Sequence, residues 1–246
     1  MGAVELVLVR HGESEGNVAA ERAYREKTDR IAVPARDPDV VLSATGREQA
    51  HALGEHLAEL PESKRPETVW VSPYVRAQQT ARIALDTAGF ELPYRVDERI
   101  RDRELGILDA LTGRGVRRLY PEEADRRQWL GKFYYRPPGG ESWADVALRI
   151  RSFLADVDRE EDGRRVLVVC HDAVITLFRY VCERIDERTL LDAAQANPVP
   201  NASLTRLVRP SGTGIWEAAM VSGTEHLETE DAPVTEHQGR TDVPQS

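Results

Sequence analysis

Two short stretches of this 246-residue sequence contain residue types that could bind and attack an anionic group. Arg10 and His11 stand side by side directly after the apolar run 4–9, which predicts a buried strand. His171 likewise follows a second apolar run, residues 166–170. A neutral imidazole can act as a nucleophile near pH 7, and a guanidinium pairs well with phosphate oxygens. These residues therefore indicate chemistry on a phosphate group.

Arg76 completes the expected anion site. It lies in "VSPYVRAQQTA", about one turn into a predicted helix that follows a third apolar run at residues 68–72. Because parallel strands end at the same edge of a sheet, the two arginines and two histidines can converge there. Together with helix N-termini they would form a pocket for a phosphate dianion. His11 is the expected nucleophile, because the arginine beside it can hold the phosphoryl oxygens.

The stretch "ERIRDRELG", residues 98–106, contains carboxyl groups that could protonate a leaving oxygen. It follows a predicted fourth strand near residues 92–96. Burial would raise the pKa of such a carboxyl group, whereas the nearby arginines would lower it. The sequence does not decide which effect is larger.

The elements that must position these residues alternate along the chain. Each buried strand is followed by a helix signal, which predicts an α/β fold with a mostly parallel sheet and helices on both faces. Thr45 and Glu48 predict a capping box at the start of one helix. Ser72 is expected to cap the helix that carries Arg76. Asp172 is expected to cap the helix that follows the predicted strand at residues 166–170.

The C-terminal part departs from this alternation. Residues 203–208 and 214–221 flank the turn-rich "RPSGT" and predict a hairpin or an antiparallel edge. Two long polar connections, residues 19–40 and 106–140, are expected to be inserts near the site and to set specificity. The second contains "YPEEADRRQWLGKFYY", which predicts a helical cap over the site.

Composition limits the class of protein further. The net charge of −9 disfavours a nucleic-acid partner, and no apolar run is long enough for a membrane span. The N-terminus lacks a signal-peptide pattern, so we expect a cytoplasmic protein with Cys170 and Cys182 as free thiols. Residues 222–246 are acidic and poor in bulky apolar residues, which predicts a disordered tail after a single domain at residues 1–221.

"VRHGESEGN" resembles the signature of the histidine phosphatase superfamily, also called the phosphoglycerate mutase-like family. "LSATGREQAHALG", "VSPYVRAQQTA", "PGGESWADV", "VVCHDAVI" and "PNASLTRL" resemble its other sequence blocks in the same order, over about residues 4–208. The resemblance implies a three-layer α/β/α fold and a phosphohistidine intermediate, with no metal and no organic cofactor. It implies His11 as nucleophile and a phosphate pocket formed by Arg10, Asn17, Arg76 and His171.

Two positions depart from the family pattern. Family members usually carry a glutamate four residues before the glycine of the acid motif, and here that position is Asp102. Glu104 could reach the site instead, so both remain candidates for the general acid. Asp172 stands where the family often has glycine. An acidic group there would weaken the phosphate pocket unless it points away as a helix cap, which is our expectation.

The favoured function is hydrolysis of a small phosphomonoester. A metal hydrolase is disfavoured because the neighbouring arginines would oppose a cation. A phosphoglycerate mutase is disfavoured because the stretch after "RHG" and the acid motif "RDRELG" differ from those of mutases. A non-catalytic phosphate-binding protein on the same fold is the third alternative. The other histidines, His51, His56, His226 and His237, have no expected chemical role, and the substrate and oligomeric state stay open.

Overall fold

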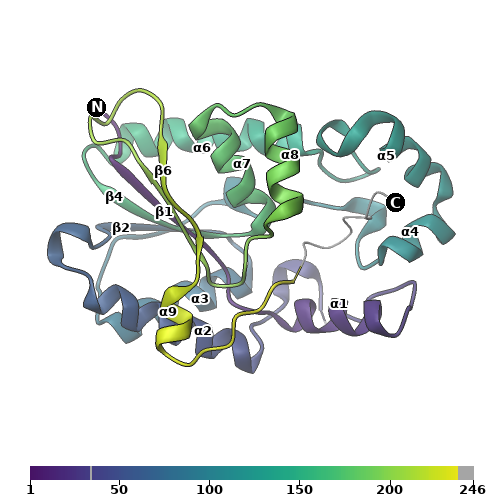
Figure 1. Ribbon diagram of the computed structural model, residues 1–246, viewed down its shortest axis with the longest axis horizontal. Helices are drawn as coiled ribbons and strands as arrows, with labels where there is room; N and C mark the ends of the chain where they lie inside the picture. The colour runs from purple at the N-terminus through teal and green to yellow at the C-terminus, as the bar shows by residue number, and fades with distance from the viewer. Residues whose placement is uncertain (34, 238–246) are drawn as a thin grey trace.

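The computed structural model describes residues 1–33 and 35–237, and these form a three-layer α/β/α arrangement (Figure 1). Its central six-stranded sheet has the strand order β3-β2-β4-β1-β5-β6. The strands are β1 Glu5–Arg10, β2 Thr68–Val71, β3 Tyr94–Val96, β4 Arg165–Cys170, β5 Leu204–Val208 and β6 Glu217–Gly223. Strands β1 to β4 pair in parallel, whereas β5 and β6 are antiparallel to their neighbours. The predicted fold class and the antiparallel edge are confirmed.

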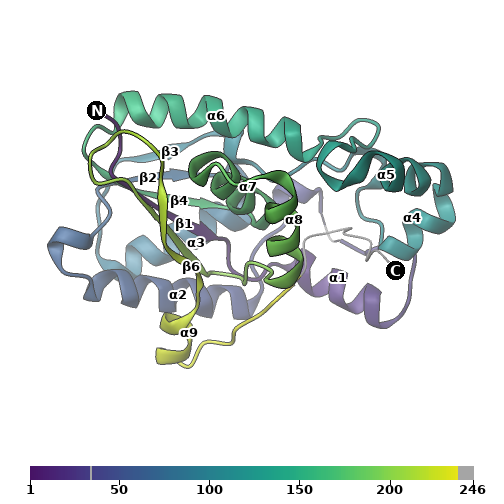
Figure 2. The ribbon, with the colours of Figure 1, turned by 45° about the horizontal axis from the view of Figure 1, so that its top comes forward.

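Helices cover both faces of the sheet (Figure 2), and a hydrophobic cluster lies on each face. One contains Phe153, Val168 and Phe178 and joins the sheet to α6 and α7, while the other contains Val9, Leu53 and Ala81 and joins it to α2 and α3. Strands β1, β2 and β4 are mostly apolar and buried because both faces of the sheet are covered there, whereas the edge strand β3 is partly exposed. The four covering helices are α2 Ala44–Glu59, α3 Val75–Ala88, α6 Trp143–Glu160 and α7 Asp172–Glu183. Helix α8, Glu187–Ala196, follows α7 in the chain.

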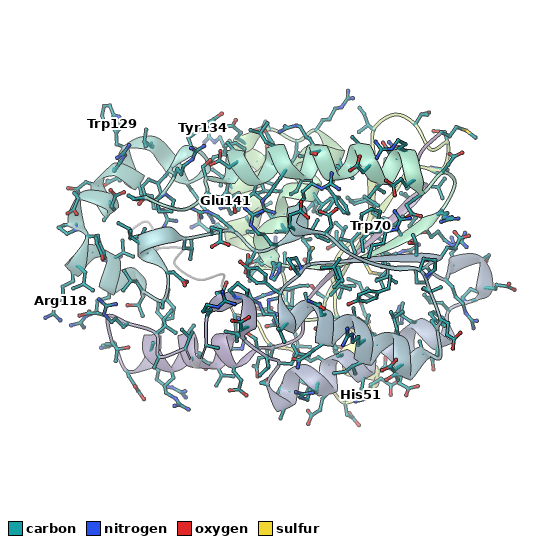
Figure 3. All side chains as sticks on the ribbon, turned by 180° about the vertical axis from the view of Figure 1, so that it is seen from behind. His51, Trp70, Arg118, Trp129, Tyr134 and Glu141 are labelled. Atoms are coloured by element: carbon teal, nitrogen blue, oxygen red, sulfur yellow. The ribbon has the colours of Figure 1, made fainter. Side chains whose placement is uncertain are left out.

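The two inserts pack against each other beside the sheet. The first contains most of α1, Glu15–Arg25, and the second forms α4, Gly113–Leu119, and α5, Pro121–Tyr134. Ile31 N donates to Ala110 O, and Gly115 approaches Asp29 so closely that an added Cβ would lie 1.9 Å from its carbonyl oxygen. The predicted helical cap is present. Its exposed Trp129 and Tyr134 point away from the sheet (Figure 3).

Three helix starts differ from the predictions. Ser43, and not Thr45, caps α2, and its Oγ accepts a hydrogen bond from Gly46 N. Helix α3 begins after Tyr74, whereas Ser72 hydrogen-bonds to His171. His171 occupies the N-cap position of α7, so Asp172 is its first helical residue. Each prediction missed the helix start by one or two residues, because polar residues near the start can all serve as caps and the sequence does not decide among them.

The prediction of a disordered tail is wrong for residues 222–237, while residues 238–246 lie outside the described residues. Strand β6 extends to Gly223 and is followed by α9, Glu225–Thr229. Leu227 is fully buried against Ala52 and Ala202. A segment with few apolar residues can fold here because it packs on a surface that the domain has already formed.

Within the described part of the chain, no helix is long and apolar enough to cross a membrane. Cys170 and Cys182 are buried free thiols, as predicted.

Candidate active site

The carboxyl ends of β1 and β4 bring the two predicted histidines together. His11 directly follows β1 and His171 directly follows β4, and these strands are paired in parallel. The two imidazole centroids lie 5.1 Å apart at an interplanar angle of 62°. Both side chains are buried. The predicted convergence at one edge of the sheet is therefore found in the structure.

Arg76 reaches this pair from the first turn of α3. Its Nε donates to His11 Nε2 at 3.2 Å, and its side chain is only 4% exposed. His11 Nδ1 lies 2.7 Å from Gly12 O, so Nδ1 must carry the proton and Nε2 keeps its lone pair. Burial, with the positive charges of Arg76 and other neighbours, lowers the pKa of His11 well below its ordinary value of 6.5. The unprotonated Nε2 required of a nucleophile is present at neutral pH.

Glycine at two positions fixes the loop that carries His11. A Cβ added to Gly12 would lie 2.4 Å from Gly46 O, and one added to Gly46 would lie 1.9 Å from Glu13 O. Gly12 N also donates to Thr80 Oγ1. The loop after β1 is thereby held against the N-terminus of α2 and against α3.

Asn17 lies at the start of α1 and lines the same cavity. Its Oδ1 accepts from Ser14 N at 3.0 Å, which completes a capping box. Asn201 Nδ2 lies 3.5 Å from this Oδ1 and 3.1 Å from His11 O. Asn201 was not singled out in the sequence, although it lies in the "PNASLTRL" block.

His171 is held between a hydroxyl and a carboxylate. Its Nε2 hydrogen-bonds to Ser72 Oγ at 2.8 Å, and its Nδ1 lies 3.4 Å from Asp102 Oδ2. Burial lowers the pKa of His171 to about 3, and the Asp102 carboxylate only partly opposes this effect. His171 is therefore neutral at pH 7 and can donate one N–H to a bound oxyanion.

The two candidate acids occupy different depths of the cavity. Asp102 Oδ2 accepts from Arg76 Nη2 at 3.0 Å, and its side chain is 29% exposed. Glu104 accepts from Tyr74 Oη at 3.0 Å, and its side chain is 48% exposed. Burial and the nearby carboxylates raise the pKa of Tyr74, so its hydroxyl remains a donor. Asp102 thus lies against the histidine and arginine groups, whereas Glu104 lies farther out.

Arg10 is oriented by main-chain carbonyls. One of its Nη atoms donates to Val199 O, and the other donates to His237 O at 2.9 Å. Its Nε is buried and has no hydrogen-bond partner among the described residues. That N–H is a donor suited to an incoming anion.

The family sequence model described as "Histidine phosphatase superfamily (branch 1)" matches residues 6–220. This chain belongs to that superfamily. Its curated relatives include a phosphoglycerate mutase and a bifunctional kinase/phosphatase. The 2,3-bisphosphoglycerate-dependent phosphoglycerate mutase 2 of Gloeobacter violaceus is 35% identical over 173 residues, which is 69% of this chain and 71% of the mutase. Human 6-phosphofructo-2-kinase/fructose-2,6-bisphosphatase 3 is 32% identical over 183 residues, 74% of this chain but only 30% of that protein.

Solved structures of the histidine phosphatase superfamily share the fold over most of their length. Mycobacterial glucosyl-3-phosphoglycerate phosphatase, solved with VO3, is 27% identical at a TM-score of 0.68, with 90% of this chain and 100% of that chain covered. The same phosphatase has been solved with inorganic phosphate. Bacillus stearothermophilus YhfR is also 27% identical, with a TM-score of 0.68 and coverage of 91% and 98%.

Asp172 does not point away from this histidine phosphatase site as expected. It is the first residue of α7 and lines the cavity. Burial lowers the pKa of Arg10, and the charges of Asp172 and Asp102 oppose that effect. The expected cap is wrong because His171 takes the N-cap position, which turns the next residue toward the site. The negative charge of Asp172 therefore acts on Arg10.

Asp37 is a site residue that sequence reasoning missed. It lies in the 3-10 helix Asp37–Asp39 of the first insert. Arg76 Nη1 donates to Asp37 O at 2.7 Å and to its Oδ1 at 3.2 Å. Arg76 Nη2 lies 3.4 Å from Asp37 Oδ2. The carboxylate thus occupies the donors of Arg76 that a phosphate would use.

We expect Asp37→Asn to bind inorganic phosphate about tenfold more tightly than the wild type, because the anion no longer competes with a carboxylate. The measurement is the dissociation constant by titration calorimetry. Asp39→Asn is the matched control, because Asp39 is paired with Arg36 on the exposed side of the same short helix. Weaker binding by Asp37→Asn alone would instead show that Asp37 supports the pocket.

The outer cavity mixes charges of both signs with apolar groups. Lys132 of α5 lies over the Trp143 ring, with 4.4 Å from Nζ to the ring centroid. The other outer residues are Arg103, Glu104, Leu105, Asp109, Ala173, Thr176 and Ala194. Arg103, Glu104 and Leu105 come from the loop that carries Asp102, and Asp109 and Lys132 come from the second insert. The remaining residues, Trp143, Ala173, Thr176 and Ala194, come from α6, α7 and α8.

Proposed function

We propose that this protein hydrolyses phosphate monoesters through a phosphohistidine intermediate on His11. The observation that carries the proposal is the unprotonated Nε2 of His11 beside Arg76, at a cavity that Arg10 also lines. An unprotonated imidazole nitrogen beside two cations suits attack on phosphorus.

In the first step His11 Nε2 attacks phosphorus, an N–P bond forms and the bond to the leaving oxygen breaks. Arg10, Arg76 and the N–H of His171 stabilise the charge on the phosphoryl oxygens, and Asn17 adds a polar contact. Asp102 in its protonated form gives its proton to the leaving alcohol oxygen and becomes a carboxylate, with protonated Glu104 as the alternative acid.

In the second step water attacks phosphorus from the side of the departed alcohol. The same carboxylate, now ionised, takes a proton from that water, the N–P bond breaks and inorganic phosphate leaves. Residues of this chain carry every step, so the proposed reaction requires no metal ion and no organic cofactor.

The outer cavity supports a small, polar leaving group. Glu104, Asp109 and Asp172 can accept hydrogen bonds from hydroxyls, while Arg103 and Lys132 can meet a second anionic group. Such a lining suits a hydroxylated phosphoester better than an apolar one. One of the similar proteins whose names give a substrate, glucosyl-3-phosphoglycerate phosphatase, acts on a molecule of that kind.

A mutase is the second candidate, because a phosphoglycerate mutase is 35% identical to this chain. The two reactions differ in the acceptor of the phosphoryl group, which is water in one and a substrate hydroxyl in the other. Inorganic phosphate released in step with alcohol supports the phosphatase. Phosphate transfer without release supports the mutase.

The proposal is tested by trapping the intermediate. Wild-type protein mixed with p-nitrophenyl phosphate and quenched in alkali should carry one acid-labile phosphoryl group on the peptide that contains His11, located by mass spectrometry. A chain that releases p-nitrophenol with no phosphoryl group on His11, or with the group elsewhere, contradicts the mechanism.

A further inference from the structure

The C-terminal segment 232–237 runs from α9 to Arg10 at the floor of the candidate site. We propose that His237 is a positioning residue that fixes Arg10 in the orientation that binds phosphate. This inference rests on the proposed function, because it assigns a phosphate-binding role to Arg10. It concerns a histidine outside residues 6–220, the part that the family sequence model matches.

The guanidinium of Arg10 needs external acceptors to keep its orientation. It is 2% exposed, and its two Nη atoms donate to the carbonyls of Val199 and His237. Carbonyls hold the plane of the guanidinium without neutralising its charge, so the full positive charge remains for an anion. With both Nη groups held, the guanidinium keeps one orientation at the cavity that Arg10 lines, and its buried Nε has no partner among the described residues.

A hydrogen bond from the His237 side chain to Glu13 holds the residue, and with it the His237 carbonyl, in position. Its Nε2 lies 2.8 Å from Glu13 Oε2, and both side chains are about nine-tenths buried, with 12% and 10% exposed. Ser43 Oγ donates to the other oxygen of Glu13 at 2.7 Å. The hydrogen bond from His237, followed by that from Ser43, lowers the pKa of Glu13 although burial opposes the shift. Glu13 is therefore ionised and gives His237 a charged, immobile acceptor.

The rest of the segment is attached to the groups that hold the nucleophile loop. Gln49 Nε2 donates to Pro233 O at 2.7 Å and to Thr235 Oγ1 at 2.9 Å, while Gln49 Oε1 accepts from Glu13 N. Thr235 Oγ1 donates to Asn201 Oδ1, and Asn201 Nδ2 donates to His11 O. One hydrogen-bonded network thus joins the segment, the nucleophile loop and Arg10.

An Arg10 side chain that lost its hydrogen bond to the His237 carbonyl would turn toward nearby carboxylates. The carboxylates of Asp172 and Asp102 lie near enough to act on its pKa. If loss of the imidazole lets the His237 carbonyl move away, Nη2 can turn toward one of these acids and form a charge-assisted contact there. The expected cost is phosphate affinity, because the anion must then compete for the arginine.

The test measures inorganic phosphate binding by calorimetry, together with KM and kcat for p-nitrophenyl phosphate. His237→Ala should raise the dissociation constant and KM about tenfold, with a smaller change in kcat. His237→Gln, whose amide can still donate to Glu13, should restore most of the affinity. His51→Ala is the matched control, since His51 is exposed and hydrogen-bonded to Thr87 alone among the described residues.

A double-mutant cycle separates positioning from a merely structural role. In an Arg10→Ala background, His237→Ala should cause little further loss of affinity, because its effect acts through Arg10. Equal losses in both backgrounds, or wild-type affinity in His237→Ala, overturn the inference. A wild type that binds phosphate without hydrolysing esters contradicts only the proposed function. A wild type that fails to bind phosphate contradicts both.

Discussion

His11→Ala is expected to lose about 10³-fold or more of the rate of p-nitrophenyl phosphate hydrolysis, equivalent to about 4 kcal/mol of transition-state stabilisation. Alanine has no nitrogen that can form the N–P bond. The variant therefore lacks the unprotonated Nε2 that burial maintains in the wild type. The measurement is release of p-nitrophenol at pH 7 in excess EDTA, which also tests whether the wild type works without a metal ion.

Circular dichroism should show that His11→Ala keeps the wild-type fold, and His51→Ala should keep the wild-type rate. Loss of wild-type activity in EDTA would show that a metal ion takes part. Equal rates for His11→Ala and the wild type would falsify nucleophilic catalysis at this residue.

Asp102→Asn is expected to lower hydrolysis of an alkyl ester such as glycerol phosphate by about 10²- to 10⁴-fold, the usual contribution of a general acid. The same change should lower kcat/KM for p-nitrophenyl phosphate by less than about tenfold, because p-nitrophenolate leaves without a proton. The comparison of kcat/KM for the two esters isolates proton donation from charge changes in the pocket.

Glu104→Gln is the control for that experiment, because it removes the other candidate carboxyl group and keeps an acceptor for Tyr74 Oη. It should affect both esters by less than about tenfold. If Glu104→Gln instead shows the large loss confined to the alkyl ester, Glu104 is the acid and Asp102 serves to hold Arg76 and His171.

The central arrangement could be predicted because strand ends are visible in sequence. Arg10, His11 and His171 follow apolar runs that had to be buried strands, and parallel pairing then brings them to one edge. Arg76 could be placed because its helix begins soon after another such run. The general acid could be narrowed to two residues and no further, because depth in a cavity depends on how a loop folds.

Contacts between distant loops could not be predicted. His237 reaches Arg10 across 227 positions of the sequence, from a segment whose composition indicated disorder. Asp37 meets Arg76 because the first insert folds back over α3, and no periodic pattern encodes that path. For Asp172 the predicted helix start was wrong by one residue, and this shift changes the direction of its side chain.

The position of β1 in the sheet also has a consequence for synthesis of the chain. β1 is translated first, but its two partners are β4 and β5, which end at Cys170 and Val208. At bacterial and eukaryotic elongation rates, the ribosome needs about 10 to 40 s to reach that point. Until β4 has been synthesised, the strand that ends beside His11 has neither neighbour, so the candidate site cannot assemble before that point, and the long sequence separation of the paired strands predicts slow folding.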